Sequence, residues 1–161
     1  MKKHIFLFAG VFMLLTAFYG CSSKNNNITD IVEMSLRKND VLFGDSLKTC
    51  FVIPGAGCPG CIASGIHFLN QNQQYFLKNQ KENLVVFTHV VSKKLLNRTL
   101  KGLKVSELNA VIDTKGMYNI DCKESKYPLI IYLDKGRIIG VDYQSPTVNG
   151  IETYKKHLFK Q

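Results

Sequence analysis

Two cysteines, Cys58 and Cys61, flank Pro59 and Gly60 directly after a Pro/Gly-rich turn. The apolar run from Phe51 to Ile53 before this turn is typical of a buried β-strand, and a helical pattern begins right after it. Two thiols this close can reduce a disulfide of another molecule and become joined by a disulfide themselves, or the reverse. The rest of the chain is therefore interpreted around this stretch.

The expected position of Cys58, at the start of a helix, favours its thiolate form. The N–H groups of a first helical turn have no partner within the helix, and the helix dipole places partial positive charge there. Free cysteine has a pKa of about 8.5, and cysteines at such positions have pKa values of roughly 3.5–7.5. We therefore expect the pKa of Cys58 to be lowered, which makes its sulfur nucleophilic at neutral pH.

Two other interpretations of the pair remain open. A disulfide between Cys58 and Cys61 would close a ring over only two intervening residues, which stabilises a fold little through chain entropy. The pair can nevertheless persist as a static disulfide. The thiols could also form half of a metal site, completed by His67 or His89. We interpret the pair as an exchange pair and both histidines as ordinary packing or surface residues, so no metal and no cofactor is predicted.

The residues around the pair predict the elements that position it. We expect a helix from about Pro59 to Asn79, a buried strand from Leu84 to Val91, a helix from Lys93 to about Leu103 and a short strand from Ala110 to Ile112. The apolar residues expected to face the core in the two helices are Ile62, Ile66, Leu69, Phe76, Leu77, Leu95, Leu96 and Leu100. Residues 28–47 predict a lead-in helix or loop, with Val41 to Phe43 as a candidate edge strand.

The stretch from Lys126 to Val141 predicts a β-hairpin. Two apolar strands flank the turn sequence Asp134-Lys135-Gly136, and Pro128 stands at the start of the first strand. Proline is tolerated there because its missing N–H removes no bond from inside the sheet, and a cis bond is compatible with this place. A last helix is expected to begin at Ser145-Pro146.

This order of elements resembles that of thioredoxin-fold proteins, nearest to the membrane-anchored proteins of the TlpA type. The resemblance covers about residues 41–160 and rests on Gly57-Cys58-Pro59-Gly60-Cys61 after a strand and on Tyr127-Pro128 before the hairpin. It implies an α/β fold, a three-layer sandwich in which a central mixed β-sheet is flanked by helices.

The resemblance also implies roles for single residues. Cys58 matches the family's exposed attacking cysteine and Cys61 its resolving cysteine, so the two would form a redox-active disulfide. Pro128 matches the cis-proline that packs over the pair. Tyr127 and Pro128 are then expected to bind the backbone of a substrate protein.

The chain departs from this family at three places. It has no Trp, and Gly57 stands where the family has one before the pair. The order Pro59-Gly60 is the reverse of that in thioredoxin, and Val52 takes the position of a buried acid. Without that carboxylate, the resemblance implies that resolution by Cys61 is slower or uses water as the proton acceptor.

Residues 1–20 have the pattern of an export signal, with Lys2 and Lys3 before an apolar run that is shorter than the roughly 20 residues of a spanning helix. Gly20 and Cys21, followed by polar residues, resemble the lipobox of bacterial lipoproteins, which implies that Cys21 is lipidated and anchors the protein to the cell envelope. We therefore expect a signal peptide at 1–20, the lipidated cysteine and a polar tether or lead-in at 21–40, and the thioredoxin-like domain at 41–161. Plain secretion and an uncleaved anchor are the alternatives.

The chain carries 21 Lys and Arg against 12 Asp and Glu. Removal of residues 1–20, which hold Lys2 and Lys3 and no acid, leaves 19 against 12, a formal charge of +7. The basic residues form no dense block, so nucleic acid is not an expected partner. About 140 residues suffice for one domain with a core, but not for two.

Two further cysteines, Cys50 and Cys122, lie outside the pair. Cys50 is expected to be a small buried residue of a core strand, or half of a structural disulfide. Cys122 stands six residues before Pro128 and could be a third redox thiol, a structural partner or a buried small residue.

Three functions are therefore considered. The first is a lipid-anchored thiol–disulfide oxidoreductase of a bacterial envelope that acts on protein partners. The second is a binding module in which the groove beside Pro128 holds an extended segment and the pair stays oxidised. The third is a metallochaperone that uses the same cysteines.

Overall fold

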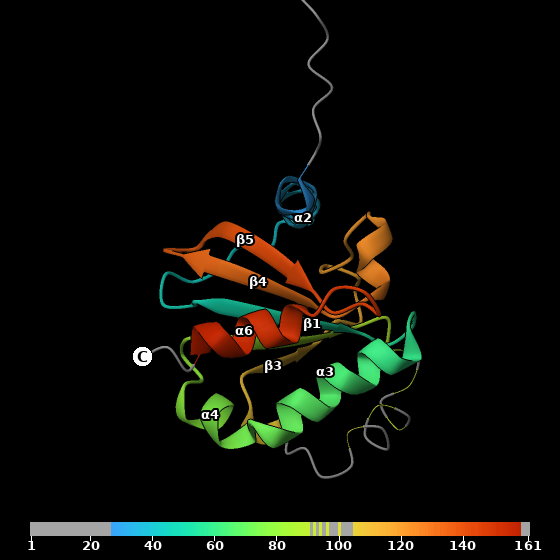
Figure 1. Cartoon of the computed structure of the whole chain (residues 1–161). Helices are drawn as coiled ribbons and strands as arrows, with labels where there is room; N and C mark the ends of the chain where they lie inside the picture. The colour runs from blue at the N-terminus through green and yellow to red at the C-terminus, as the bar shows by residue number, and fades with distance from the viewer. Residues whose placement is uncertain are drawn as a thin grey trace, which may run out of the picture.

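The computed structural model describes residues 27–90, 92, 94, 96, 100 and 105–158. Five strands form one mixed sheet in the order β3-β2-β1-β4-β5, with helices on both of its faces (Figure 1). The strands are β1 (Thr49–Pro54), β2 (Asn83–Thr88), β3 (Ala110–Ile112), β4 (Leu129–Asp134) and β5 (Arg137–Tyr143). The helices are α2 (Ile28–Lys38), α3 (Pro59–Gln71), α4 (Gln73–Lys78) and α6 (Gly150–Leu158), with 3₁₀ turns at Val105–Glu107 and Lys123–Lys126. The predicted α/β sandwich is confirmed.

Strand β1 is the centre of the sheet. It pairs in parallel with β2, from Thr49 opposite Asn83 to Pro54 opposite Thr88, and antiparallel with β4. All of its residues are buried. A strand that is covered on both faces needs apolar residues on both, which explains why this segment shows no alternation of polar and apolar residues.

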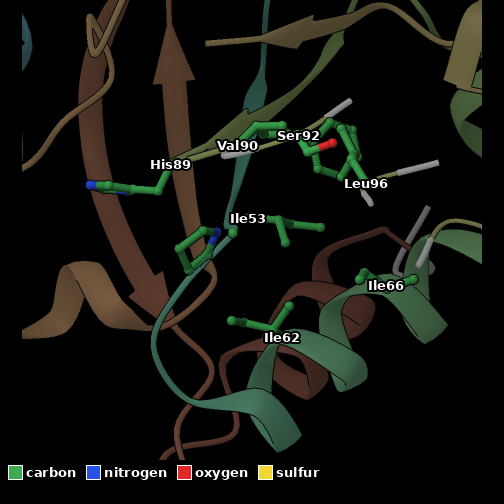
Figure 2. A pocket seen from close by; sticks show the side chains of 10 residues that line it. Ile53, Ile62, Ile66, His89, Val90, Ser92 and Leu96 are labelled. Atoms are coloured by element: carbon green, nitrogen blue, oxygen red, sulfur yellow. The ribbon is translucent and has the colours of Figure 1, made fainter. Parts of the chain in front are cut away.

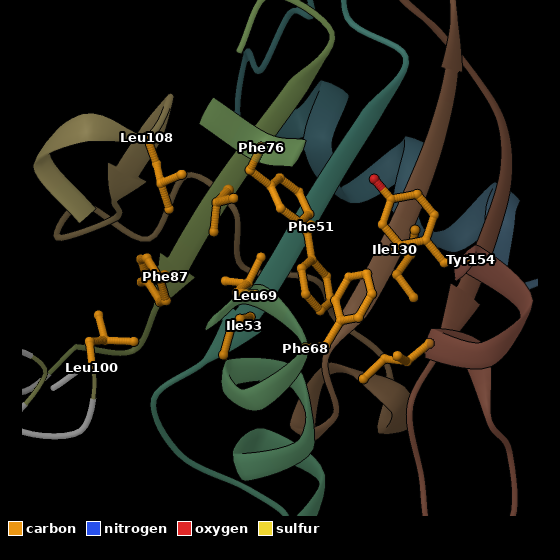
Figure 3. Packing of buried hydrophobic residues seen from close by; sticks show 12 residues of the cluster. Phe51, Ile53, Phe68, Leu69, Phe76, Phe87, Leu100, Leu108, Ile130 and Tyr154 are labelled. Carbon is orange, nitrogen blue, oxygen red and sulfur yellow. The ribbon is translucent and has the colours of Figure 1, made fainter. Parts of the chain in front are cut away.

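Side chains of β1 alternate between two cores. Phe51 and Ile53 belong to the cluster under α3, α4 and α6, where the ring of Phe51 meets that of Phe68 edge to face with centroids 5.8 Å apart (Figure 3). Cys50 and Val52 belong to the cluster on the opposite face, under α2. Burial of a large apolar side chain contributes about 1.5–3 kcal/mol, so these two clusters hold the three layers together.

Helix α2 lies within the predicted lead-in and covers one face of the sheet. It buries Val32 and Leu36, and the side chain of its N-cap, Asn27, accepts a hydrogen bond from the amide of Thr29. The segment Val41 to Phe43 that follows has no strand pairing in the described part of the chain, so the candidate edge strand is wrong. Within the described residues, no helix is long and apolar enough to span a bilayer.

The predicted helix from Pro59 to Asn79 is two helices, because the chain breaks at Asn72. The carbonyl of Phe68 accepts from both the Asn72 side chain at 2.8 Å and the Asn72 backbone amide at 3.1 Å, so Asn72 closes α3 as its C-cap. The strand predicted to run from Leu84 to Val91 ends earlier, at Thr88, because His89 takes a left-handed conformation with φ of 53°. Val91 lies outside the described residues.

The helix predicted from Lys93 to Leu103 falls mostly outside the described residues. Within it, the Leu96 amide donates to the carbonyl of Ser92 and the Leu100 amide to that of Leu96, which is α-helical spacing. The last helix begins at Gly150, later than predicted. The Ser145 hydroxyl instead accepts hydrogen bonds from the amides of Thr147 and Val148, which turns the chain before the helix starts.

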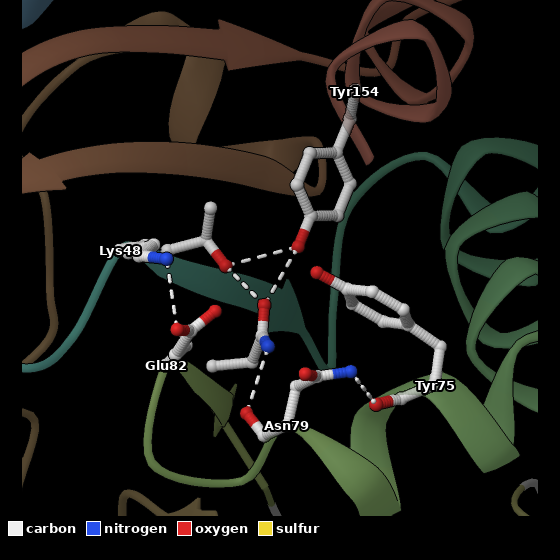
Figure 4. A network of polar contacts seen from close by, with 7 residues as sticks. Lys48, Tyr75, Asn79, Glu82 and Tyr154 are labelled. Atoms are coloured by element: carbon white, nitrogen blue, oxygen red, sulfur yellow. Dashed lines mark hydrogen bonds and ion pairs between the residues drawn. The ribbon is translucent and has the colours of Figure 1, made fainter. Parts of the chain in front are cut away.

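A buried polar cluster joins β1, β2 and α6 at the end of the sheet away from the cysteine pair (Figure 4). The hydroxyl oxygen of Thr49 lies 2.6 Å from Asn83 Oδ1 and 2.9 Å from the Tyr154 hydroxyl, which in turn donates to Asn83 Oδ1 at 3.0 Å. Nearby, Lys48 and Glu82 form an ion pair at 2.8 Å. Each buried polar atom of the cluster thus has a partner, as burial requires.

We predict that Tyr154→Phe lowers the free energy of unfolding by about 1–3 kcal/mol, because it removes one partner from the buried Thr49 hydroxyl and one from Asn83 Oδ1, which then keep only their bond to each other. Urea denaturation of both proteins measures the difference. The control is Tyr118→Phe, which removes a half-buried hydroxyl with no hydrogen bond among the described residues. Equal losses in the two variants would contradict the prediction.

Burial raises the pKa of Tyr118 to about 12, and burial also raises the pKa of Tyr132 and of Tyr154. An unfolded tyrosine has a pKa of about 10, so the unfolded chain loses these protons first. The unfolded state then binds fewer protons, and the free energy of unfolding falls as pH rises. We predict that this contribution is constant below about pH 9 and declines between about pH 10 and 12. Urea titrations across that range test this, and a flat or rising free energy of unfolding would contradict it.

Candidate functional site

The cysteine pair lies where β1 passes into α3. The strand ends at Pro54, residues 55–57 form a bend, and Cys58 is the N-cap of α3 with Pro59 in the first turn. Cys58 and Cys61 are joined by a disulfide, with their Cα atoms 5.3 Å apart. Proline suits this place because its missing N–H is one of the amides that a first turn leaves without a helical partner.

The two sulfurs differ in exposure. Cys58 is partly exposed, whereas the Cys61 residue is only 5% exposed and packs in the first turn of α3. The amide of Cys61 points to the Cys58 sulfur at 3.4 Å, in the manner of an N-cap hydrogen bond. A reduced Cys58 would therefore present its sulfur to solvent beside the positive end of a helix, which stabilises a thiolate.

The segment before β4 lies directly against the pair. The Cys58 amide donates to the carbonyl of Lys126 at 3.1 Å, and the ring of Pro128 lies against α3 at Gly65, where a β-carbon would be 3.2 Å from Pro128 Cγ. The ring of Tyr127 stacks on that of Tyr143 with centroids 5.9 Å apart. The fold thus brings Pro128 and Tyr127 to the pair from about seventy residues away in the chain.

The Tyr127–Pro128 peptide bond is trans, because the structure has no cis bond in its described residues. The cis bond implied by the resemblance is therefore wrong for this structure. Pro128 itself is buried and stands where the hairpin begins, as predicted.

Val52 stands at the position where the resemblance to thioredoxins implies a buried acid. It is 3% exposed and belongs to the apolar cluster under α2. Cys50 is fully buried in the same cluster, and burial raises the pKa of its thiol. Cys122 packs against that cluster at its edge, and burial raises its pKa too. Neither thiol forms a disulfide, so Cys50 is the small buried residue that was predicted.

Both histidines considered as ligands are exposed. His67 lies on α3, and His89 follows β2 with its Nδ1 3.1 Å from the Thr88 hydroxyl. No group of three or more His, Cys, Asp or Glu side chains capable of holding a metal occurs in the residues that the structure describes.

Sequence reasoning missed two features of this region. One is an apolar cavity of about 100 Å³ between α3 and the segment after β2, lined among others by Ile53, Ile62 and His89 (Figure 2). The other is Gly65, whose place against Pro128 could only have been suspected from its being an isolated glycine inside a helical pattern. Cys21 and the predicted signal segment lie outside the described residues.

A disulfide at this spacing, beside a mixed sheet flanked by helices, fits a thioredoxin-like fold. No protein-family model matches the chain, and no curated protein matches it.

Proposed function

We propose that this protein is a thiol–disulfide oxidoreductase of the TlpA type, anchored to a bacterial cell envelope by a lipid on Cys21 and acting on protein partners. The observation that carries the proposal is the Cys58–Cys61 disulfide at the first turn of α3, with the segment preceding Pro128 hydrogen-bonded to it. The sequence pattern of residues 1–21 supports the export and the anchor.

The reaction starts from the reduced protein. The Cys58 thiolate attacks one sulfur of a partner disulfide; a mixed disulfide forms, and the other partner sulfur leaves as a thiolate that takes up a proton. Cys61 then loses its proton and attacks the Cys58 sulfur, which releases the second partner thiolate. The partner has gained two electrons, and Cys58 and Cys61 are again joined by a disulfide. The reverse sequence oxidises a partner dithiol.

The structure supports a division of labour between the two cysteines. Cys58 is the more exposed residue of the two, so a large partner reaches it first. Cys61 is nearly buried beside Cys58, so it meets the mixed disulfide from within the protein. Since Val52 provides no proton acceptor, water takes the Cys61 proton in this proposal.

In this proposal, an extended partner segment lies along Tyr127 and Pro128, which follow Lys126 in the chain. Lys126 contributes its carbonyl to Cys58 and its ammonium group to the face of Tyr127, 5.2 Å from the ring centroid. These contacts would hold the segment from Lys126 to Pro128 in place relative to the attacking sulfur. Positioning of this kind accelerates a reaction between two bound groups.

We predict that the full chain carrying Cys61→Ser accumulates mixed disulfides with partner proteins through Cys58, because the resolving thiol is absent. Non-reducing gel electrophoresis and mass spectrometry of the captured proteins measure this. Cys58→Ser/Cys61→Ser is the control and should capture none. Equal capture by the double variant, or no capture by Cys61→Ser, would overturn the proposed function.

We also predict that after reduction Cys58 reacts with iodoacetamide at neutral pH at least about tenfold faster than Cys122, since a helix start stabilises a thiolate and burial disfavours one. Cys50 should react only when the protein unfolds, because it is fully buried. Peptide mass spectrometry after timed labelling gives all three rates. A Cys58 that reacts as slowly as Cys50 would contradict the prediction.

A further inference from the structure

Two glycines outside the cysteine pair face the segment from Lys126 to Pro128. Gly57 faces Lys126, and Gly65 faces Pro128. Gly57 precedes Cys58 and has a φ of 136°, a conformation that other residues rarely adopt. A β-carbon on Gly57 would overlap the carbonyl oxygen of Lys126, which is the oxygen that accepts the Cys58 amide at 3.1 Å. The absence of a side chain at Gly57 therefore permits this hydrogen bond.

Gly65 makes the second contact, from the side of α3. It is buried, and a β-carbon there would lie 3.2 Å from Cγ and 3.4 Å from Cβ of Pro128. These separations are shorter than the 3.5–4.0 Å at which carbon atoms attract each other best. The ring of Phe51, which is packed in the core, would lie 3.6 Å from the same β-carbon, an ordinary contact distance. A methyl group on Gly65 therefore requires a shift of a few tenths of an ångström between the helix and Pro128.

We propose that Gly57 and Gly65 are positioning residues of the exchange site, which act by letting the Lys126 to Pro128 segment lie against Cys58. This inference rests on the proposed function. Neither glycine touches a reacting sulfur through a side chain, so their effect must pass through the segment that would hold the partner's backbone. Exchange with a protein disulfide should depend on them more than exchange with a small disulfide.

Gly60 supplies a matched control in the same stretch. It lies in the first turn of α3, has no left-handed conformation, and a β-carbon there would meet no atom within 4 Å. Gly60→Ala can change the reactivity of the thiols, but it gives no cause for the proline segment to shift. It should therefore alter the rates with protein and small disulfides in the same proportion.

The experiment compares the reduced full chain with Gly57→Ala, Gly65→Ala and Gly60→Ala, using insulin as the protein disulfide and dithiodipyridine as the small one. We expect the ratio of the insulin rate to the dithiodipyridine rate to fall about tenfold for Gly57→Ala and about threefold for Gly65→Ala, since a shift of 1 Å can cost up to about a hundredfold in rate. The ratio for Gly60→Ala should equal that of the native protein. If Gly57→Ala does not fold, Gly65→Ala decides the test.

A double-mutant cycle tests whether Gly65 acts through the proline. In the Pro128→Ala background Cγ, the atom nearest the new methyl group, is gone and only the Cβ contact at 3.4 Å remains, so Gly65→Ala should lower the insulin ratio less than about twofold there. An equal loss in both backgrounds overturns the inference, as does a Gly65→Ala ratio equal to that of Gly60→Ala. A native protein that reacts with neither disulfide would instead overturn the proposed function.

Discussion

Burial of β1 on both faces is the constraint on which the rest of the structure depends. The strand lies between β2 and β4 and sends alternate side chains into two apolar clusters, so neither its register nor its direction can change without exposing one of them. Its last residue, Pro54, therefore has a fixed place at the carboxyl end of the central strand. Cys58 follows four residues later, at the start of a helix that packs through Phe68 and Leu69 onto the same strand.

The same strand brings the second half of the site into place. Antiparallel pairing sets Val52 opposite Leu129, and so Pro128 stands beside the end of β1 where the cysteine loop begins. Outside the sheet, the hydrogen bond from the Cys58 amide to the carbonyl of Lys126 joins the segments that follow β1 and precede β4. The pairing of β1 with β4 thus sets the position of Pro128 relative to the cysteine pair, together with the loop contacts.

The parts of this arrangement that follow from local pattern could be predicted from the sequence. The unbroken apolar run of β1, the proline after Cys58 and the turn at Asp134-Lys135-Gly136 each have one favoured local structure, and each was found. Boundaries set by single side chains were not predictable in this way. Asn72 caps α3 where one longer helix was expected, with its side chain bonded to the carbonyl of Phe68, and His89 ends a strand by adopting a left-handed backbone.

The contacts of the site could not be predicted from local sequence patterns, because they join residues far apart in the chain. Nothing near Gly65 in the sequence indicates that Pro128 will meet it, since the distance is set by the packing of α3 on β1 and by the pairing of β1 with β4. The trans bond before Pro128 likewise contradicts an expectation taken from a resemblance. The cavity beside Ile62 depends on residues from three segments, so it appears only when these are assembled.

The sheet also separates the four cysteines of the described chain into two compartments. Cys58 and Cys61 lie at the start of α3, whereas Cys50 is sealed in the opposite core and Cys122 packs at the rim of that core. Four thiols in an unfolded chain can be joined in three complete ways, and only the folded sheet selects among them. A chain that meets an oxidant before β1 is covered is therefore open to mispairing, and one that folds first is protected. Burial of Cys50 in the folded core thus removes it from any later pairing.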